Sequence, residues 1–491
     1  MGTVIEDLHF LVWGPWTLVL FLGTGLWFTI QSGFFQYRGI GCWWRETGGS
    51  LWRDGGERRE KGTEKGRKRV TRFQSACTAL AATIGTGNIA GVATALTAGG
   101  PGALFWMWVS AAIGMMTAYT ETYLGQLYRY RKPDGEWMCG PMVYMERGLQ
   151  SPALGILYAL LAVLSSLGMG SMVQSNSISG TLWSSAGMPP TVSGILVTVL
   201  AGAVILGGIR RISSVSEKLM PISAGIYTFF SLVVVISCWD LLPGIFAEIF
   251  REAIRPKSVG GGVAGFLLSR SVRYGLSRGV FSNEAGLGSL AVLHGAAEDT
   301  TPEQQGMWAM FEVFFDTIVV CTLTALVILC GQHYGAGSTG LAHAGDGAAL
   351  TAWCFSLRLG VLGEILVSGS MAVFAFATII AWYYLGRQTF VYLTERLGGG
   401  GLSGKLWDKV YLGCYLLAVY LGCVSRLETV WLISDLWNGM MAYPNLLAIL
   451  WLSWQVRYPI SNSASKTVKK LNGFRLDKSG GNEYTKINKR E

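Results

Sequence analysis

The stretch that decides the fold is "ATIGTGNIAGVATAL", which runs from Ala82 to Leu96. Its Gly85, Gly87 and Ala90 match the G-x-G-x-x-G/A pattern of a dinucleotide-binding turn. That turn needs a strand before it, a helix after it and an acidic residue about 20 residues further on. Here "FQSACTALA", whose pattern fits a helix or leaves the element undecided, precedes the glycines, and no acid follows until Glu121. The motif also lies in the middle of an apolar segment, so it predicts an interruption in a membrane helix instead of a nicotinamide site.

The composition is that of an integral membrane protein. The chain has 491 residues, of which 51% are hydrophobic and only 14% charged. A soluble domain carries about 25% charged residues. The 19 Trp and 66 Gly point the same way, because interfacial aromatic residues and close-packing glycines are enriched in membrane helices.

Eleven apolar runs are long enough to cross a bilayer core of about 30 Å. The first run follows Glu6 and Asp7, where a signal peptide would carry Lys or Arg, so it is predicted as a span and not as a cleaved signal. The predicted spans are 10–31, 75–98, 101–128, 152–176, 191–209, 219–240, 260–295, 307–331, 360–386, 408–424 and 429–455.

Lys and Arg gather in alternate loops, which are 31–74, 129–132, 210–218, 387–409 and the tail from 457. By the positive-inside rule these loops are cytoplasmic, which places the N-terminus outside and the C-terminus inside. The net charge of +9 therefore needs no nucleic acid. The basic stretch 53–72 is predicted to set the topology and touch anionic lipid, with a nucleic-acid or regulatory role as the alternative. The tail is predicted to be disordered.

A second interruption occurs in "LSRGVFSNEAGLGSL", Leu276 to Leu290. Paired interrupted helices in corresponding positions of two inverted halves indicate the binding site of a secondary transporter. The prediction is an N-terminal extra helix (1–31), a basic cytoplasmic loop (32–74), two inverted repeats of five helices (75–240 and 259–456) and a basic tail (457–491). In the alternative reading, Gly87-x-x-x-Gly91 is a helix-packing face. That reading leaves the neighbouring Gly, Thr and Asn unexplained.

Five motifs carry a family resemblance: "GTGNIAGVATA", "RGVFSNEAGLGS", "DTIVVCTLTALVI" (Asp316 to Ile328), "FATIIAWYYLG" (Phe376 to Gly386) and "MVQSN" (Met172 to Asn176). Together they resemble the alanine/glycine:cation symporters over about 73–458. The resemblance implies an all-α membrane protein with a LeuT-like core of ten helices, two of them discontinuous, preceded by one extra helix. It also implies Na⁺-coupled uptake of small neutral amino acids, with no cofactor beyond the coupling ion and no obligate protein partner.

The substrate of such a symporter is a zwitterion. Its carboxylate suits the free N–H groups where the second half-helix starts, those of Thr86, Gly87 and Asn88. Its ammonium needs acceptors, which are carbonyls within Phe281, Ser282 and Asn283 or the side chain of Gln174. On the predicted span 360–386, one helix face carries Met371, Ala375, Thr378 and Trp382. The pocket walls are predicted to be Thr378, Trp382 and Phe281.

The LeuT-like pattern also implies two Na⁺ sites. One would take the carbonyls of Ala81 and Ile84 with Ala375 and the Thr378 hydroxyl. The other would take Thr83, Asn88, Ser282 and Asp316.

Each of these assignments has a simpler alternative. A buried Gln174 could make an interhelical hydrogen bond, and the stripe ending at Trp382 could be core packing. Asp316 could be the partner of an arginine, with Arg270, Arg273 and Arg278 as the candidates. An acid within a span is functional by default, whereas acids nearer span ends are expected at the interface. The acids of that second kind are Glu121, Glu312 and Glu364.

Three other functions compete with Na⁺ symport. A proton-coupled permease would use Asp316 or Glu284 as the proton carrier. A membrane enzyme is disfavoured, because the chain has only four His and neither H-E-x-x-H nor G-x-S-x-G. A channel is disfavoured by the lack of a continuous polar stripe.

Overall fold

The computed structural model describes residues 12–53, 70–133, 135–254, 270–334, 347–398 and 402–459. In these ranges almost all regular structure is helical, and the one sheet is a hairpin of β1 (Tyr130–Arg131) and β2 (Trp137–Met138). Among the described residues, six segments are long and apolar enough to cross a membrane: Gly102–Tyr128, Pro152–Ala186, Gly208–Ile236, Pro302–Tyr334, Val361–Arg396 and Leu406–Val424.

The helices before the second interruption largely follow the predicted spans. In chain order they are α2 (Pro15–Gln31), α3 (Phe35–Arg38), α4 (Ile40–Glu46), α5 (Gly48–Arg53), α6 (Arg72–Thr83), η1 (Thr86–Asn88), α7 (Ala90–Gly99), α8 (Gly102–Tyr128), α9 (Pro141–Arg147), α10 (Pro152–Leu167), η2 (Gly168–Val173), α11 (Gln174–Ala186), α12 (Pro190–Ile205), α13 (Gly208–Ile236) and α14 (Leu242–Ala253). The predicted loop 32–74 contains three short helices, and its most basic part, 54–69, lies outside the described residues, as does the tail from 460.

The remaining helices are α16 (Arg270–Asn283), α17 (Ser289–His294), α18 (Pro302–Val313), η4 (Phe314–Cys321), α19 (Thr322–Tyr334), α21 (Ala348–Leu359), α22 (Val361–Arg396), α23 (Leu402–Val424), α24 (Leu427–Trp451) and η5 (Ser453–Gln455). The segments η2 and η4 are π-helical turns within longer helices. Such turns occur often at functional sites, and the sequence analysis did not predict either of them.

The first interruption is confirmed. The helix α6 begins with a capping box at Thr71 and ends at Thr83, after which Ile84 (ψ 94°) and Gly85 (φ −139°, ψ −147°) leave the helical region. A short 3₁₀ turn, η1, then leads into α7. Helices flank the glycines on both sides, so the dinucleotide interpretation fails.

The second interruption is confirmed as well. Between α16 and α17 the backbone has positive φ at Glu284 (57°), Gly286 (93°) and Gly288 (82°). A Cβ on Gly288 would come within 2.3 Å of Cγ of Pro141. The segment therefore requires glycine for both its conformation and its close packing.

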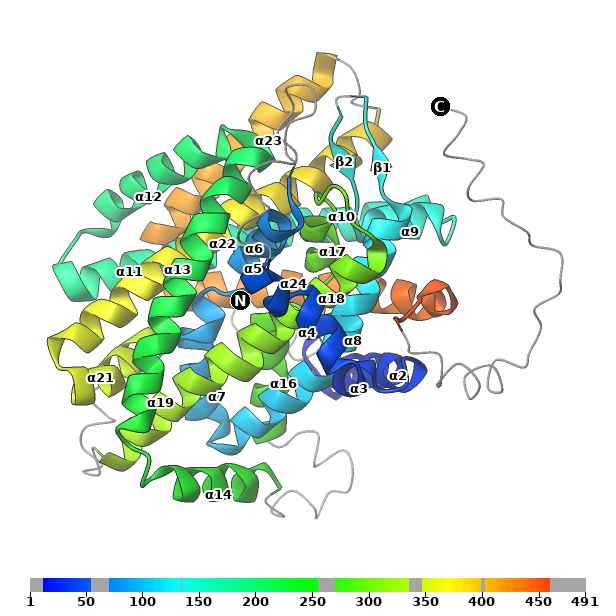
Figure 1. The fold of residues 1–491 in the computed structure, drawn as a ribbon. Coiled ribbons are helices and arrows are strands. Elements are labelled where there is room, and N and C mark those ends of the chain that lie inside the picture. The colour runs from blue at the N-terminus through cyan, green and yellow to red at the C-terminus, as the bar shows by residue number, and fades with distance from the viewer. Residues whose placement is uncertain are drawn as a thin grey trace.

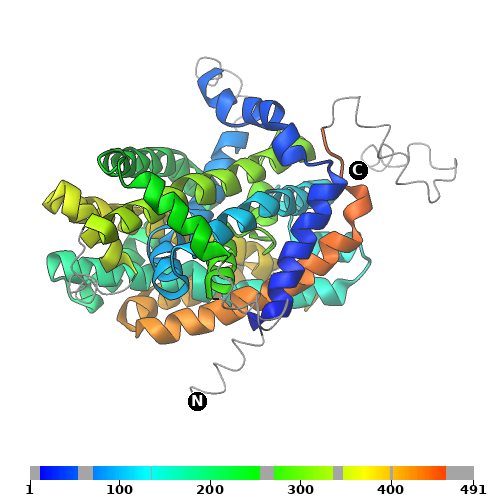
Figure 2. The same ribbon diagram turned by 90° about the horizontal axis from the view of Figure 1, so that it is seen from below.

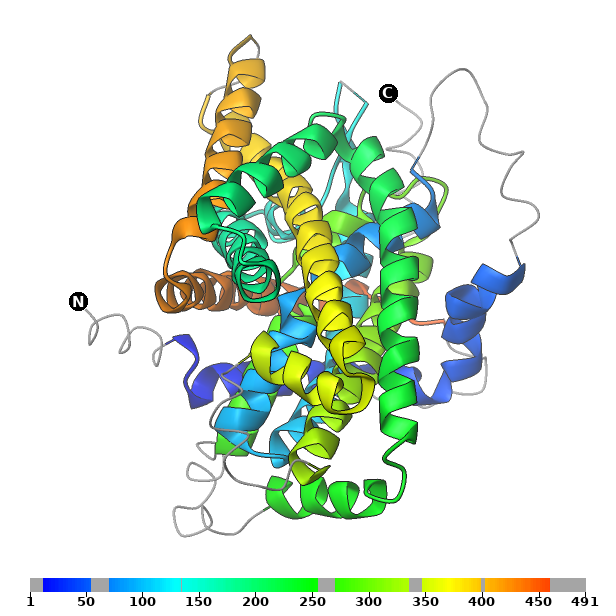
Figure 3. The ribbon, with the colours of Figure 1, turned by 90° about the vertical axis from the view of Figure 1, so that its left-hand side faces the viewer.

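The long helices α13 and α22 lie side by side (Figure 3). The helix α14 runs across one end of the molecule, while the β1–β2 hairpin projects from the opposite end (Figure 1). Arg387 joins that hairpin to α23 through contacts of 2.8 Å to Glu136 and 2.9 Å to Asp408. The predicted loop 387–409 is mostly helical, because α22 continues to Arg396 and α23 begins at Leu402. It lies at the same end of the molecule as the predicted loop 129–132.

The additional N-terminal helix α2 lies beside α24 (Figure 2). The indole Nε1 of Trp13, just before α2, donates to the carbonyl oxygen of Asp435 at 2.9 Å, and the Thr17 and Tyr443 hydroxyls are hydrogen-bonded. The extra helix is therefore attached to α24, the last long helix in the described part of the chain.

Candidate functional site

The two interrupted helices meet at Gly87. A Cβ at this position would lie 3.3 Å from Cα of Ser282 and 3.4 Å from Cδ1 of Phe281. At Gly91, by contrast, the nearest atom is the Thr86 carbonyl oxygen at 3.9 Å. The glycine pair is therefore not a helix-packing face, since only its first member makes a close approach.

Asn88, Ser282 and Asp316 form one hydrogen-bonded cluster. Asn88 Nδ2 donates to Asp316 Oδ1 at 2.6 Å, and Ser282 Oγ donates to Asp316 Oδ2 at 2.8 Å. The Asp316 carboxylate lies in the π-helical turn η4 and also accepts from Thr317 Oγ1 at 2.8 Å. Asn88 and Ser282 come from the two interrupted helices, so the arrangement joins η1, α16 and η4 around one buried acid.

Two predicted residues lie apart from this carboxylate. The Thr83 hydroxyl donates within its own helix, to the carbonyl oxygens of Ala79 and Leu80. Asn283 Nδ2 donates to Thr317 Oγ1 at 3.1 Å. Asn283 therefore contacts η4 through Thr317 and not through the Asp316 carboxylate.

The alternative that pairs Asp316 with an arginine is wrong for the described structure. Arg278 pairs instead with Asp435 at 3.3 Å, and no ion pair in the described ranges includes Asp316. Its oxygens are occupied by hydroxyl and amide donors.

A second constellation joins the end of α6 to α22. Thr378 Oγ1 donates to the Ala81 carbonyl oxygen at 2.9 Å and to the Phe374 carbonyl oxygen at 3.0 Å. A Cβ on Gly85 would come within 2.7 Å of the same hydroxyl. Two of the four groups predicted for the first ion site are thus in contact. The other two, Ile84 and Ala375, are fully buried. Ile84 follows Ala81 by three positions, and Ala375 precedes Thr378 by three.

Gln174 reaches the start of the second half-helix. Its Oε1 accepts from the backbone N–H of Thr86 at 3.3 Å, while its Nε2 donates to the Met169 carbonyl oxygen at 3.2 Å. The Thr86 hydroxyl is fully buried and has no hydrogen-bond partner within the described ranges. Gln174 therefore makes an interhelical bond, and it makes it at the predicted anion site.

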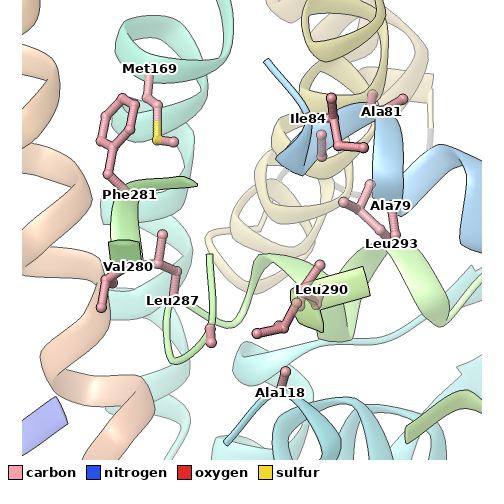
Figure 4. Packing of buried hydrophobic residues seen from close by; sticks show 14 of the residues in the cluster. Ala79, Ala81, Ile84, Ala118, Met169, Val280, Phe281, Leu287, Leu290 and Leu293 are labelled. Atoms are coloured by element: carbon pink, nitrogen blue, oxygen red, sulfur yellow. The ribbon is translucent and has the colours of Figure 1, made fainter. Parts of the chain in front are cut away.

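Phe281, Trp431 and Arg278 form one layer on the side of Phe281 that faces away from Gly87. The Phe281 ring stacks on Trp431 with centroids 5.2 Å apart, and the Arg278 guanidinium lies 5.5 Å from the Phe281 ring and 5.3 Å from the Trp431 ring. A cavity of about 230 Å³ opens beyond this layer, lined by Phe281 and Trp431 together with Trp13, Arg273, Tyr274, Ser277, Arg278, Leu432 and Asp435. Figure 4 shows Phe281 at the end of α16 with its ring toward Met169. Phe281 thus extends from Gly87 to the cavity.

All four members of the predicted stripe on α22, from Met371 to Trp382, are fully buried. Trp382 Nε1 donates to Glu284 Oε1 at 2.9 Å. A Cβ on Gly170, within the π-helical turn η2, would lie 2.4 Å from Cβ of Trp382. The indole is therefore fixed between η2 and the second interruption.

The expectation that Glu121 and Glu312 lie at the membrane interface is wrong, since both are fully buried, whereas Glu364 is exposed as predicted. Neighbouring helices cover the ends of these spans, which hydropathy along a single segment does not show. Sequence reasoning also missed Cys321, whose Sγ lies 3.4 Å from Asn88 Nδ2 and 3.3 Å from Ser282 Oγ. A cysteine in an apolar run gives no signal of such contacts.

Two interrupted helices that converge on buried polar groups in a bundle of membrane-spanning helices define a secondary transporter of the LeuT-like fold. The same fold is found in a solved Na⁺-coupled sialic acid symporter, which is 14% identical, covers 91% of this chain and 82% of its own, and has a TM-score of 0.51. The chain belongs to the sodium:alanine symporter family, whose model matches residues 1–472.

Two relatives show the extent of the similarity. The sodium/alanine symporter AgcS of Methanococcus maripaludis is 38% identical over 92% of this chain and 94% of its own length. A transporter of Haemophilus influenzae is 38% identical over 92% of this chain and 93% of its own. The chain is therefore a Na⁺-coupled amino-acid transporter and not an enzyme.

Proposed function

We propose that this protein carries small neutral amino acids, alanine and glycine, into the cytoplasm together with Na⁺, by alternating access across the plasma membrane. The observation that carries the proposal is the meeting of the two interrupted helices at Gly87. This residue has no side chain, and its backbone faces Phe281 and Ser282. A site this close-packed suits a substrate whose side chain is a methyl group or a hydrogen atom.

The substrate carboxylate binds the N–H groups at the start of the second half-helix, those of Thr86, Gly87 and Asn88. Gln174 Oε1 occupies the Thr86 N–H in this structure, so it is the group that the carboxylate displaces. The freed side-chain amide of Gln174 then turns toward the substrate. The carbonyls from Phe281 to Asn283 accept from the ammonium, and Phe281, Thr378 and Trp382 form the walls.

Two Na⁺ sites flank the substrate. The first takes Ala81, Ile84, Ala375 and Thr378, and the contact between the Ala81 carbonyl and the Thr378 hydroxyl supports it. The second takes Thr83, Asn88, Ser282 and Asp316, and the cluster of the last three supports it. For Thr83 to join this site its hydroxyl must turn away from Ala79 and Leu80.

Alternating access requires a barrier on each side of the substrate. The layer of Phe281, Trp431 and Arg278 lies between Gly87 and the cavity. By the positive-inside rule the N-terminus and this cavity are outside and the C-terminus is inside. The two repeats, 75–240 and 259–456, supply one interrupted helix each, and lipid surrounds the bundle.

The experiment is uptake of labelled alanine into proteoliposomes that contain the purified protein. An inward Na⁺ gradient should drive accumulation. An inside-negative potential should increase it, because the two bound Na⁺ ions carry positive charge inward while Asp316 is the one charged side chain in the two proposed sites. A panel of L- and D-amino acids as competitors defines the substrate range. Accumulation on a pH gradient alone, with Na⁺ absent, would establish the proton-coupled permease instead.

A further inference from the structure

The helix α17, the second half of an interrupted helix, ends in a row of backbone carbonyl groups. Carbonyls in the last turn of a helix have no partner within the helix. Side chains of the first repeat donate to the carbonyls in and just after this turn, although α17 belongs to the second repeat. The donors and the residues whose carbonyl oxygens accept are Cys139 with Val292, Ser75 with Leu293, Gln126 with His294, and Arg129 with both Gly295 and Ala297. The end of α17 is therefore held by the other half of the molecule.

Arg129 is the one cation in this set, and it connects α17 to the β1–β2 hairpin. It lies at the end of α8, directly before β1. Its Nη1 donates to the Gly295 carbonyl oxygen at 2.9 Å, and its guanidinium lies 4.2 Å from the centroid of the Trp137 ring in β2. A cation is stabilised both by an aromatic face and by the partial negative charge of carbonyls at a helix end. The guanidinium is thus held between the hairpin and the end of α17.

Arg387 fixes the same hairpin to α22 and α23. Its Nη1 lies 2.8 Å from Oε2 of Glu136, just before β2, and its Nη2 lies 2.9 Å from Oδ2 of Asp408 on α23. A second pair joins Lys132, just after β1, to Glu395 on α22 at 3.2 Å. The hairpin is therefore fixed to α17 by one arginine and to α22 by another.

We call the contacts of Arg129 with Gly295 and of Arg387 with Glu136 the clasp. Both contacts join the first repeat to the second, at the end of the molecule that the positive-inside rule predicts to be cytoplasmic. The clasp is not deeply buried, since the side chains of Arg387 and Glu136 are 22% and 33% exposed. Water can replace such contacts, and exposed ion pairs each contribute little to stability. This combination suits a contact that opens and closes repeatedly, unlike the fully buried carboxylate of Asp316.

The position of the clasp connects it to transport. Alternating access requires the two repeats to separate on the side from which the substrate leaves. We propose that Arg129 and Arg387 are positioning residues of the inner gate, which hold the hairpin across the end of α17 until the clasp opens and lets alanine and Na⁺ reach the cytoplasm. Neither arginine is among the residues of the proposed substrate and Na⁺ sites. The clasp itself rests on the contacts above, whereas its role in transport rests on the proposed function.

The clasp is tested by the reactivity of Cys139. This residue directly follows β2 and is fully buried against α17, and a buried thiol is inert. Its alkylation by a maleimide, followed by mass spectrometry of the full-length protein in proteoliposomes, reports how often the hairpin lifts from α17. Arg129→Gln and Arg387→Gln should each raise the rate about fivefold or more, the change expected for the loss of one or two hydrogen bonds. Arg131→Gln is the matched control and should keep the wild-type rate, because Arg131 bonds within the hairpin, to the Gly135 carbonyl oxygen at 3.2 Å.

Arg387→Gln breaks the clasp at α22 and not at α17, so it decides the test even where Arg129→Gln folds poorly. Arg387→Lys keeps the charge but lacks the planar fork that binds two acids, and it should give an intermediate rate. If Arg387→Gln leaves the alkylation of Cys139 at the wild-type rate, or if Arg131→Gln raises it equally, the clasp is overturned.

The role in transport is tested by locking the hairpin to α22. Lys132→Cys combined with Glu395→Cys places two thiols across this junction, and a short bifunctional thiosulfonate joins them through bonds that a reductant breaks. Cross-linking should stop alanine counterflow at saturating Na⁺, and reduction should restore it. Each single cysteine variant, treated alike, should respond far less than the pair.

A cross-linked protein that exchanges alanine as fast as after reduction has a static hairpin, and this result overturns the role in transport. If the wild type carries no alanine under any condition, the proposed function has failed. The alkylation of Cys139 still decides whether the clasp exists, because that measurement needs no substrate.

Discussion

The Thr378 hydroxyl on α22 donates a hydrogen bond of 2.9 Å to the carbonyl oxygen of Ala81, two residues before the end of α6. This contact links the end of an interrupted half-helix to a continuous helix of the bundle. Carbonyls near a helix C-terminus have no intrahelical partner and carry partial negative charge. The bond therefore marks a place where two oxygens can turn toward a cation.

The first prediction is that Thr378→Val raises the Na⁺ concentration needed for half-maximal alanine uptake by roughly fivefold, since a lost hydrogen bond or ligand oxygen is worth about 1 kcal/mol. The change keeps the size of the side chain and removes only the hydroxyl. Thr378→Ser is the matched control and should stay near the wild type. Uptake measured over a range of Na⁺ at fixed alanine checks both. Equal Na⁺ dependence in the two variants would remove Thr378 from the ion site.

The second prediction concerns the charge of Asp316. Asp316→Asn keeps the shape but loses the charge that Asn88 and Ser282 stabilise, and interactions of a charged group are worth about 1.5–3 kcal/mol. The half-saturating Na⁺ concentration should rise about 10- to 100-fold. Thr317→Val removes one donor to the same carboxylate but leaves the charge, and it should change Na⁺ affinity much less. If Asp316→Asn lowers only the yield of folded protein, the acid is a structural hydrogen-bond acceptor.

Much of this fold could be predicted from the sequence, because hydropathy over about 20 residues marks a span and clusters of glycine and small polar residues mark its interruptions. Both interruptions occur where "GTGN" and "SNEAGLG" predict them. The π-helical turns η2 and η4 could not be predicted. Their local composition is as apolar as that of an ordinary helix, and only tertiary contacts select the extra residue.

The candidate site was predictable in part for a similar reason. Asn88, Ser282 and Asp316 stand out as polar groups inside spans, where such residues are costly, and they do come together. The orientation of each side chain was not predictable. The Thr83 hydroxyl stays within its own helix, and the Glu121 carboxyl is covered by helices far away in the sequence. Those outcomes depend on neighbours that a single segment does not reveal.

The third prediction distinguishes the interrupted helix from simple helix packing. Gly87→Leu should abolish alanine transport, because its side chain would enter the space bounded by Ser282 and Phe281 while hydropathy and membrane insertion are preserved. Gly91→Ala is the matched control, since its Cβ would meet only one atom, at 3.9 Å. It should retain transport. Counterflow with equal amounts of folded protein is the measurement, and an active Gly87→Leu variant would contradict the proposed substrate position.

The last prediction concerns selectivity and Trp382. The indole is fully buried on the same face of α22 as Thr378, and it is held by Glu284 and packed against Gly170. Trp382→Ala removes contacts from a small substrate and opens space for a larger one. Loss of such packing costs a few kcal/mol, so alanine should bind about 100-fold more weakly. Leucine or methionine should then compete better against labelled alanine than they do in the wild type.

Trp382→Phe separates the two roles of the indole, because it keeps most of the bulk and loses the N–H that Glu284 accepts. If bulk sets the selectivity, this variant should still favour alanine over leucine, and the preference should change only in Trp382→Ala. If the ranking of small over large substrates stays the same in both variants while overall activity falls, Trp382 only supports the interruption. The wall must then lie elsewhere, and Phe281 is the next candidate, because its ring reaches from Gly87 to the cavity.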